Sequence, residues 1–139
     1  MKMRSRWDDV PESVRASMRS NKSKGTRPEV AVRSLLWSLG YRYQLHRRDL
    51  PGKPDIVFPV KRKAVFVHGC FWHQHEGCRK AHIPHSRIEY WMPKLARNRA
   101  RDIAVLSAME NIGWLALVVW ECEIENREAL TNKLRAFLQ

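Results

Sequence analysis

Residues 114–120 read WLALVVW, a run of seven apolar residues that no polar side chain interrupts. The run has the length of a β-strand, and a strand without polar residues at alternate positions needs cover on both of its faces. Sheets covered on both faces carry a layer of helices on each side. The segment therefore predicts a layered α/β domain.

Other segments are expected to form the remaining strands of the sheet. Buried strands are expected over 56–58 (IVF) and 63–68 (KAVFVH), joined by a basic turn. A strand over 41–47 (YRYQLHR) is expected before the turn LPGKPD, whose prolines forbid a continuing ladder. The order of strands and helices predicts a single α/β domain with a central mixed β-sheet flanked by helices.

Three helices are expected from capping residues and apolar periodicity. They run from the cap Thr26 to Gly40, over 87–111 with Ser86 as the cap, and over 126–138. We place three tryptophans in the core: Trp37, Trp114 and Trp120.

The chain has a formal net charge of +12, which favours a polyanionic partner; an acidic membrane surface is the alternative. The sequence has no run of about 18 apolar residues, so it predicts no membrane span. The first residues lack the apolar core of a signal peptide, and three cysteines do not suit a disulfide framework. We therefore expect a cytoplasmic protein that does not enter a membrane.

Residues 1–27 are expected to form a basic arm ahead of the folded domain, 28–139. The arm carries eight lysines and arginines, among them Lys22 and Lys24, and few large apolar residues. It is either a disordered tail or an arm that becomes ordered along a phosphate backbone.

Soft metal ligands gather after the strand at 63–68. Cys70, His75 and Cys78 have the spacing C-x4-H-x2-C. Zinc takes four such ligands, and Cys122 reaches the same place if the strand before it lies beside 63–68. Three cysteines and one histidine would close the site, so we expect structural Zn2+. The alternative is core thiols with a surface histidine.

Asp55 begins the strand at 56–58, next to a second strand. A carboxylate there, with groups from the neighbouring strand, suits Mg2+, which can activate water against a phosphodiester. The arrangement resembles the PD…(D/E)xK pattern of restriction endonucleases, although no ExK follows. The alternative is that Asp55 only forms a turn after Pro54.

Five segments in this order resemble the very-short-patch repair (Vsr) endonuclease family: MRSNKSKGTRPE, LPGKPDIVF, VHGCFWHQHEGC, YWMPKLARNRARD and GWLALVVWEC. The resemblance covers nearly the whole chain. It implies a restriction-endonuclease-like fold, structural Zn2+ and catalytic Mg2+. It also implies a nick in one DNA strand, 5′ to the mispaired T of a T·G mismatch left by deaminated 5-methylcytosine. The expected partners are mismatched double-stranded DNA and mismatch-repair proteins, and we expect a monomer.

The resemblance also implies roles for single residues. Asp55 and the backbone carbonyl of Val67 would hold Mg2+. His73 would act on the water and Asp102 would be its partner. His68 would lie near the scissile phosphate, and Glu29 would hold water around the metal. The zinc ligands would be Cys70, His75, Cys78 and Cys122.

The resemblance implies an aromatic wedge of Phe71, Trp72 and Trp91 between base pairs. We also expect DNA contacts by Lys22, Lys24, Arg97 and Asn98. Each role has a plainer alternative. The aromatic residues can be core, and the arginines of 97–101 a solvated helix face. His73 can replace His75 as a zinc ligand, Asp102 can pair with Arg99 or Arg101, and Glu29 can simply favour its helix N-terminus.

Two other functions are alternatives to a Vsr-like endonuclease. One is a non-catalytic zinc-containing module that binds nucleic acid, and the other is a related nuclease with a different DNA target.

Overall fold

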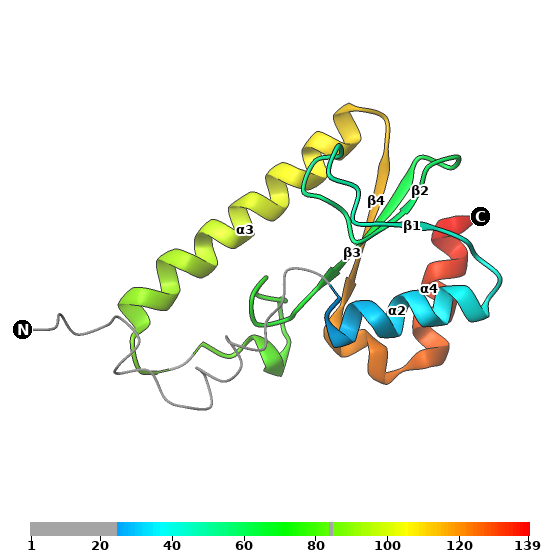
Figure 1. The fold of residues 1–139 in the computed structure, drawn as a ribbon. Coiled ribbons are helices and arrows are strands. Elements are labelled where there is room, and N and C mark those ends of the chain that lie inside the picture. The colour runs from blue at the N-terminus through cyan, green and yellow to red at the C-terminus, as the bar shows by residue number, and fades with distance from the viewer. Residues whose placement is uncertain (1–24, 84) are drawn as a thin grey trace, which may run out of the picture.

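The fold is described by a computed structural model, which places residues 25–83 and 85–139 (Figure 1). Residues 1–24 of the expected arm, with Lys22 and Lys24, lie outside the described residues. The described part has three α-helices: α2 (Arg27–Ser38), α3 (Ile88–Asn111) and α4 (Arg127–Leu138). None of the helices in these residues is long and apolar enough to cross a membrane.

The sheet has four strands in the order β1-β2-β3-β4. They are β1 (Gln44–Leu45), β2 (Ile56–Phe58), β3 (Lys63–His68) and β4 (Leu115–Trp120). The first three strands are antiparallel neighbours, whereas β3 and β4 are parallel and pair over their full length. A parallel pair needs a long crossover, which α3 provides. The predicted mixed α/β sheet is confirmed and is consistent with a restriction-endonuclease-like fold.

Helices cover both faces of the sheet (Figure 1). On one face Val65 and Val119 pack with leucines of α2 and α4. On the other face Phe66 packs with Met109 of α3. Side chains alternate along a strand, so His68 faces the same side as Phe66, toward α3. The two faces therefore present different residues at the end of β3.

The helix boundaries agree closely with the sequence prediction. Thr26 caps α2, where its hydroxyl accepts a hydrogen bond from Glu29 N at 3.3 Å. Asn126 caps α4 in the same way. The expected cap Ser86 is wrong, because Arg87 stands at the N-cap of α3 with φ 61° and makes no side-chain cap.

Two further predictions are corrected. The strand expected over 41–47 is reduced to the two residues of β1, because the backbone at His46 takes φ 51° and leaves the extended region. Trp37 is 54% exposed rather than buried, and the Arg42 guanidinium lies 3.5 Å from the centroid of its ring. Trp114 packs against the core on the α3 side, as expected.

The turn LPGKPD is held against α3 through Gly52. This glycine has φ +71°, and a methyl group on its Cα would overlap the side chain of Val105 and lie 3.2 Å from Phe66. The close approach fixes the loop that leads into Asp55.

We predict that Gly52→Ala lowers the free energy of unfolding by about 1–3 kcal/mol, because the methyl group both overpacks the α3 contact and strains the backbone. Urea denaturation measures the loss. Gly113→Ala is the matched control, since Gly113 also has positive φ but has open space around its Cα. Equal losses in the two variants would show that the contact with Val105 adds nothing.

Candidate active site

Asp55 is fixed to the end of β3 by a hydrogen bond across the strands. Its Oδ2 accepts from the backbone N–H of Val67 at 2.7 Å. Continuing the register of β2 and β3 places Val67 opposite Pro54, which has no N–H to donate. The N–H and C=O of one strand residue point to the same edge, so the Val67 carbonyl also faces this side. Asp55 and that carbonyl, the two predicted magnesium ligands, thus lie on one side of the strand end.

A second carboxylate, Glu29, lies beside Asp55. Glu29 is buried on the first turn of α2, where it accepts hydrogen bonds from Gly25 N at 3.1 Å and Arg33 at 3.3 Å. Its Oε2 is 2.8 Å from Nε2 of His46. Ligand atoms of Glu29, His46 and Asp55 all lie within 4.8 Å of one another. Two carboxylates and an imidazole this close form a donor set that fits one divalent cation.

Burial raises the pKa of Asp55 to about 6, and the neighbouring charge of Glu29 adds to the effect. The N–H of Val67 acts in the opposite direction but does not outweigh burial. A cation between the carboxylates would offset both the burial and the repulsion. The electrostatics of the pair therefore favour a bound cation.

His73 and Asp102 form a hydrogen-bonded pair on the other side of β3. His73 follows the strand, Asp102 lies on α3, and Nδ1 of the imidazole is 2.7 Å from Oδ2 of the carboxylate. Asp102 is therefore paired with His73, and not with Arg99 or Arg101 as in the alternative interpretation. A carboxylate on Nδ1 keeps the proton on that nitrogen and leaves Nε2 as a proton acceptor. The pair has the arrangement of a general base and its orienting group.

His68 lies directly against this pair. Its ring stacks on the ring of His73 with centroids 3.8 Å apart and an interplanar angle of 7°. Burial, with a smaller contribution from the neighbouring His73, lowers the pKa of His68 to about 4, so His68 is neutral near pH 7. Its buried Nδ1 has no hydrogen-bond partner in the described part of the chain. A buried ring nitrogen without a partner is unusual, and a catalytic role is one of the reasons for which proteins tolerate it.

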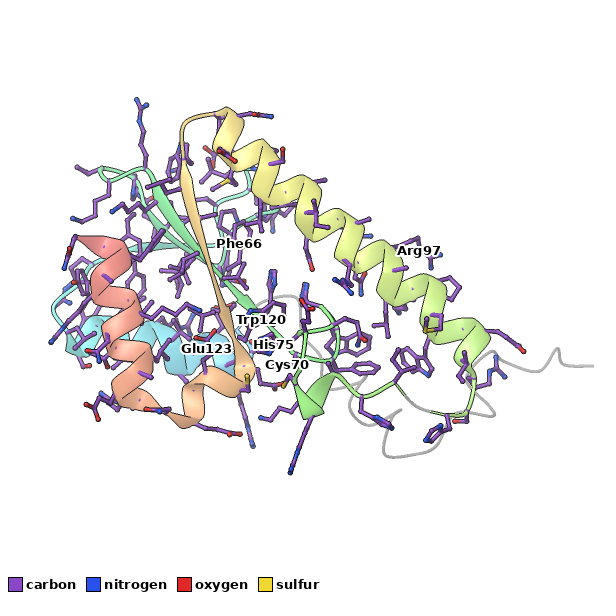
Figure 2. The ribbon with its side chains drawn as sticks, turned by 180° about the vertical axis from the view of Figure 1, so that it is seen from behind. Phe66, Cys70, His75, Arg97, Trp120 and Glu123 are labelled. Carbon is purple, nitrogen blue, oxygen red and sulfur yellow. The ribbon has the colours of Figure 1, made fainter. Side chains whose placement is uncertain are left out.

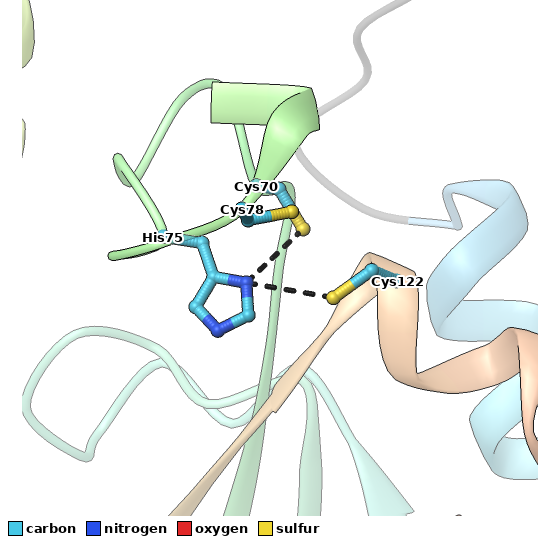
Figure 3. Close-up of side chains that lie close together, drawn as sticks. All are labelled: Cys70, His75, Cys78 and Cys122. Carbon is cyan, nitrogen blue, oxygen red and sulfur yellow. Dashed lines mark hydrogen bonds between the residues drawn. The ribbon is translucent and has the colours of Figure 1, made fainter. Parts of the chain in front are cut away.

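The four predicted zinc ligands converge, as Figure 3 shows. Nδ1 of His75 is 3.7 Å from Sγ of Cys70 and 3.4 Å from Sγ of Cys122. All four ligand atoms, with Sγ of Cys78, lie within 4.8 Å of one another. Zinc bond lengths imply separations of about 3.6 Å between ligand atoms at a tetrahedral site. The cluster therefore fits zinc, and it contains His75 rather than His73.

Trp120 connects the cysteine cluster to the histidines (Figure 2). Its ring stacks on His75 with centroids 4.2 Å apart and meets His68 edge-on at 5.3 Å. Trp120 is thus half-buried among imidazoles rather than an ordinary core residue.

The aromatic residues of the expected wedge form one cluster. Phe71 and Trp72 are partly exposed, whereas Trp91 is 1% exposed beneath them, with its ring centroid 5.3 Å from that of Phe71. Burial favours the core alternative for Trp91, which supports the other two rings and reaches no surface in this conformation.

Two residues of α3 were expected to contact DNA. Asn98 donates to the carbonyl of Trp72 at 3.0 Å. This hydrogen bond holds the loop that carries Phe71 and Trp72, the aromatic loop, against α3. Arg97 is exposed on the side of α3 away from the sheet (Figure 2). All the DNA contacts stay predictions.

His46 is not among the site residues predicted from the sequence. Its position could have been found by extending the pairing of β1 with β2, since that register places His46 opposite Asp55, whose carbonyl accepts from His46 N at 3.2 Å.

Comparison with known proteins agrees with this geometry. A family model described as DNA mismatch endonuclease Vsr matches residues 9–80. The type II nicking enzyme V.XorIIP of Xanthomonas oryzae pv. oryzae is 56% identical over 128 residues, which cover 92% of this chain and 93% of that protein. The DNA mismatch endonuclease Vsr of Escherichia coli K12 is 38% identical over 117 residues, covering 84% of this chain and 74% of that protein. The resemblance is confirmed, and the chain belongs to the Vsr family of DNA endonucleases.

Proposed function

We propose that this protein is a Mg2+-dependent endonuclease that nicks one strand of duplex DNA, 5′ to the mispaired T of a T·G mismatch. Family membership supports the reaction class. The relative from E. coli is named a DNA mismatch endonuclease, and the relative from X. oryzae a type II nicking enzyme. These names support mismatched DNA as the substrate and a single-strand cut as the outcome.

One observation carries the proposal. The Val67 N–H is bonded to Asp55, and the next residue, His68, stacks on the His73 of the His73–Asp102 pair. Two successive residues of β3 thus contact the two groups: Val67 contacts the carboxylate suited to a cation, and His68 contacts the imidazole suited to act as a base. Phosphodiester hydrolysis needs both within reach of one phosphate.

In the proposed mechanism, Nε2 of His73 takes a proton from water while the water oxygen forms a bond to phosphorus and the bond to the leaving oxygen breaks. Asp102 stabilises the imidazolium that results. Neutral His68 can donate its one ring N–H to a phosphate oxygen without competing for the proton of the water. Asp55 and the Val67 carbonyl would hold Mg2+, and Glu29, whose carboxylate adjoins Asp55, would hold it directly rather than through the water that the resemblance implies. When bound, Mg2+ would neutralise charge on the phosphate.

Recognition of the mismatch rests on the aromatic loop and the charge of the protein. Phe71 and Trp72 are partly exposed and can wedge between base pairs, where a mismatched step is easier to unstack. Arg97 and the overall charge of +12 favour the phosphate backbone. Lys22 and Lys24 would extend this contact. The rival binding module leaves the His73–Asp102 pair without a task.

We predict that Asp55→Asn lowers the nicking rate by about 10³-fold or more through loss of the cation, and that His73→Gln lowers it by about 10²–10⁴-fold through loss of the base. Asp102→Asn should have a smaller effect. A labelled duplex with one T·G mismatch is incubated with Mg2+ in several sequence contexts, beside the matched duplex, and DNA binding is measured by fluorescence anisotropy.

Glu110→Gln is the matched control, because it also neutralises a carboxylate on α3, at an exposed position. Binding without a cut in every context would favour the non-catalytic module. Equal cutting of matched and mismatched duplexes would assign a different DNA target.

The raised pKa of Asp55 predicts how cation binding depends on pH. A metal ligand must lose its proton, so below about pH 6 the protonated carboxyl competes with the cation. The affinity for Mn2+, used as a spectroscopic substitute for Mg2+, should fall about tenfold between pH 6.5 and pH 5. Electron paramagnetic resonance (EPR) of free Mn2+ measures this affinity. An unchanged affinity over that range would contradict the assignment of Asp55.

We also propose that the cysteine cluster holds one structural Zn2+, which joins the loop after β3 to the end of β4. His75→Ala should reduce the zinc content well below one ion per chain and lower the melting temperature by at least about 5 °C. Elemental analysis and calorimetry provide the measurements. His82→Ala, at an exposed histidine, is the control. Full zinc content in His75→Ala would exclude this histidine as a ligand.

A further inference from the structure

His46 is a component of the acidic site that neither the family resemblance nor the proposed mechanism uses. Its Nε2 is 2.8 Å from Oε2 of Glu29, and its ring belongs to the same group of ligand atoms as Asp55. The histidine comes from the loop after β1, whereas Glu29 comes from α2. Three separate segments therefore converge on one point.

The backbone at His46 is unusual in a way that favours this convergence. His46 has φ 51°, in the left-handed region that residues other than glycine seldom adopt. Its N–H still donates to the carbonyl of Asp55 at 3.2 Å, so the chain changes direction at a residue that remains hydrogen-bonded to the neighbouring strand segment. Left-handed residues of this kind persist where the surrounding structure holds them, and they are frequent at functional sites.

The distances suit ligands on one ion. Two ligand atoms at right angles on a cation with bonds of about 2.1 Å lie about 3 Å apart. The Nε2 of His46 and the Oε2 of Glu29 have nearly this separation already. Glu29 is only 1% exposed, and although Arg33 pairs with it at 3.3 Å, the second carboxylate leaves an excess of negative charge that favours a cation at this point.

We propose that His46 supplies a nitrogen ligand to the divalent cation at Asp55 and Glu29. The inference rests on the proposed cation site and adds to it a basis for metal selection. Imidazole suits first-row transition cations, whereas Mg2+ prefers oxygen ligands. His46 therefore raises the affinity of the site for Mn2+ more than its affinity for Mg2+.

The test uses the full-length, zinc-loaded protein. Mn2+ binding is followed by EPR, Mg2+ binding by its competition with Mn2+, and directly bound nitrogen by the ¹⁴N modulation in electron spin echo spectra. The key variant is His46→Gln, which can still donate a hydrogen bond to Glu29 but lacks the imidazole. His46→Ala removes both functions, and His82→Gln is the control at an exposed histidine.

For His46→Gln we expect about a tenfold loss of Mn2+ affinity, a loss of Mg2+ affinity under about threefold, and disappearance of the ¹⁴N modulation seen in the unaltered protein. The spin echo spectrum of the unaltered protein tests the ligand even if a variant fails to fold.

Absence of ¹⁴N modulation from the unaltered protein overturns the inference. Retention of the modulation or of the Mn2+ preference in His46→Gln overturns it too, because His46 then only holds Glu29 by a hydrogen bond. Asp55→Asn separates this failure from a wider one. If that variant binds Mn2+ normally, the proposed cation site itself is wrong; if it loses Mn2+ while His46→Gln does not, only the role of His46 fails.

Discussion

The hydrogen bond from Val67 N to Asp55 organises the candidate site. Pro54 stands opposite Val67 at the end of the antiparallel ladder, where it has no N–H for the Val67 carbonyl, and the Val67 N–H is bonded to a side chain instead. The Asp55 side chain takes up the backbone donor, and the carboxylate is thereby fixed at the end of β3. Gly52, a few residues earlier, lets the same loop approach α3 closely. The short turn thus positions a charged group that burial alone would disfavour.

The alternation of side chains along β3 separates the two groups of residues to which the proposed mechanism gives different tasks. Val67 packs toward the face of α2 and α4, beside the Asp55 and Glu29 carboxylates. His68 faces α3 and meets the His73–Asp102 pair. A cation close to a neutral imidazole competes with protons for its lone pair. In the proposed mechanism, Nε2 of His73 is kept off the cation in this way and stays available to water.

The sequence predicted those parts of the fold that depend on local chemistry. The cap Thr26 and the apolar run of β4 are readable because each satisfies a local requirement, for backbone hydrogen bonds or for burial. Pairing of β3 with β4 was predicted only conditionally, through the ligand Cys122, and the structure places the two strands side by side. The predicted convergence of the four zinc ligands follows from that pairing.

The errors arise where tertiary contacts decide the outcome. The segment 41–47 has the composition of a strand, but His46 leaves the extended conformation beside Glu29, a partner 17 residues away in sequence. Trp37 has an apolar ring, yet it lies on the exposed side of α2 under the Arg42 guanidinium. The helix α3 begins after Arg87, whose backbone is in the left-handed region. Residue preferences at helix N-termini favour Ser86 as the cap instead.

Trp120 gives the cysteine cluster a consequence beyond stability. One face of its ring stacks on His75, and an edge contact at 5.3 Å joins it to His68, which stacks on His73. Packed rings transmit displacement because a close-packed interior has little free volume to absorb it. A His75 held by a metal would therefore hold Trp120, and through it the orientation of the stacked histidines. In this arrangement the proposed closed zinc site, without an open position for substrate, would still bear on the geometry of the proposed base.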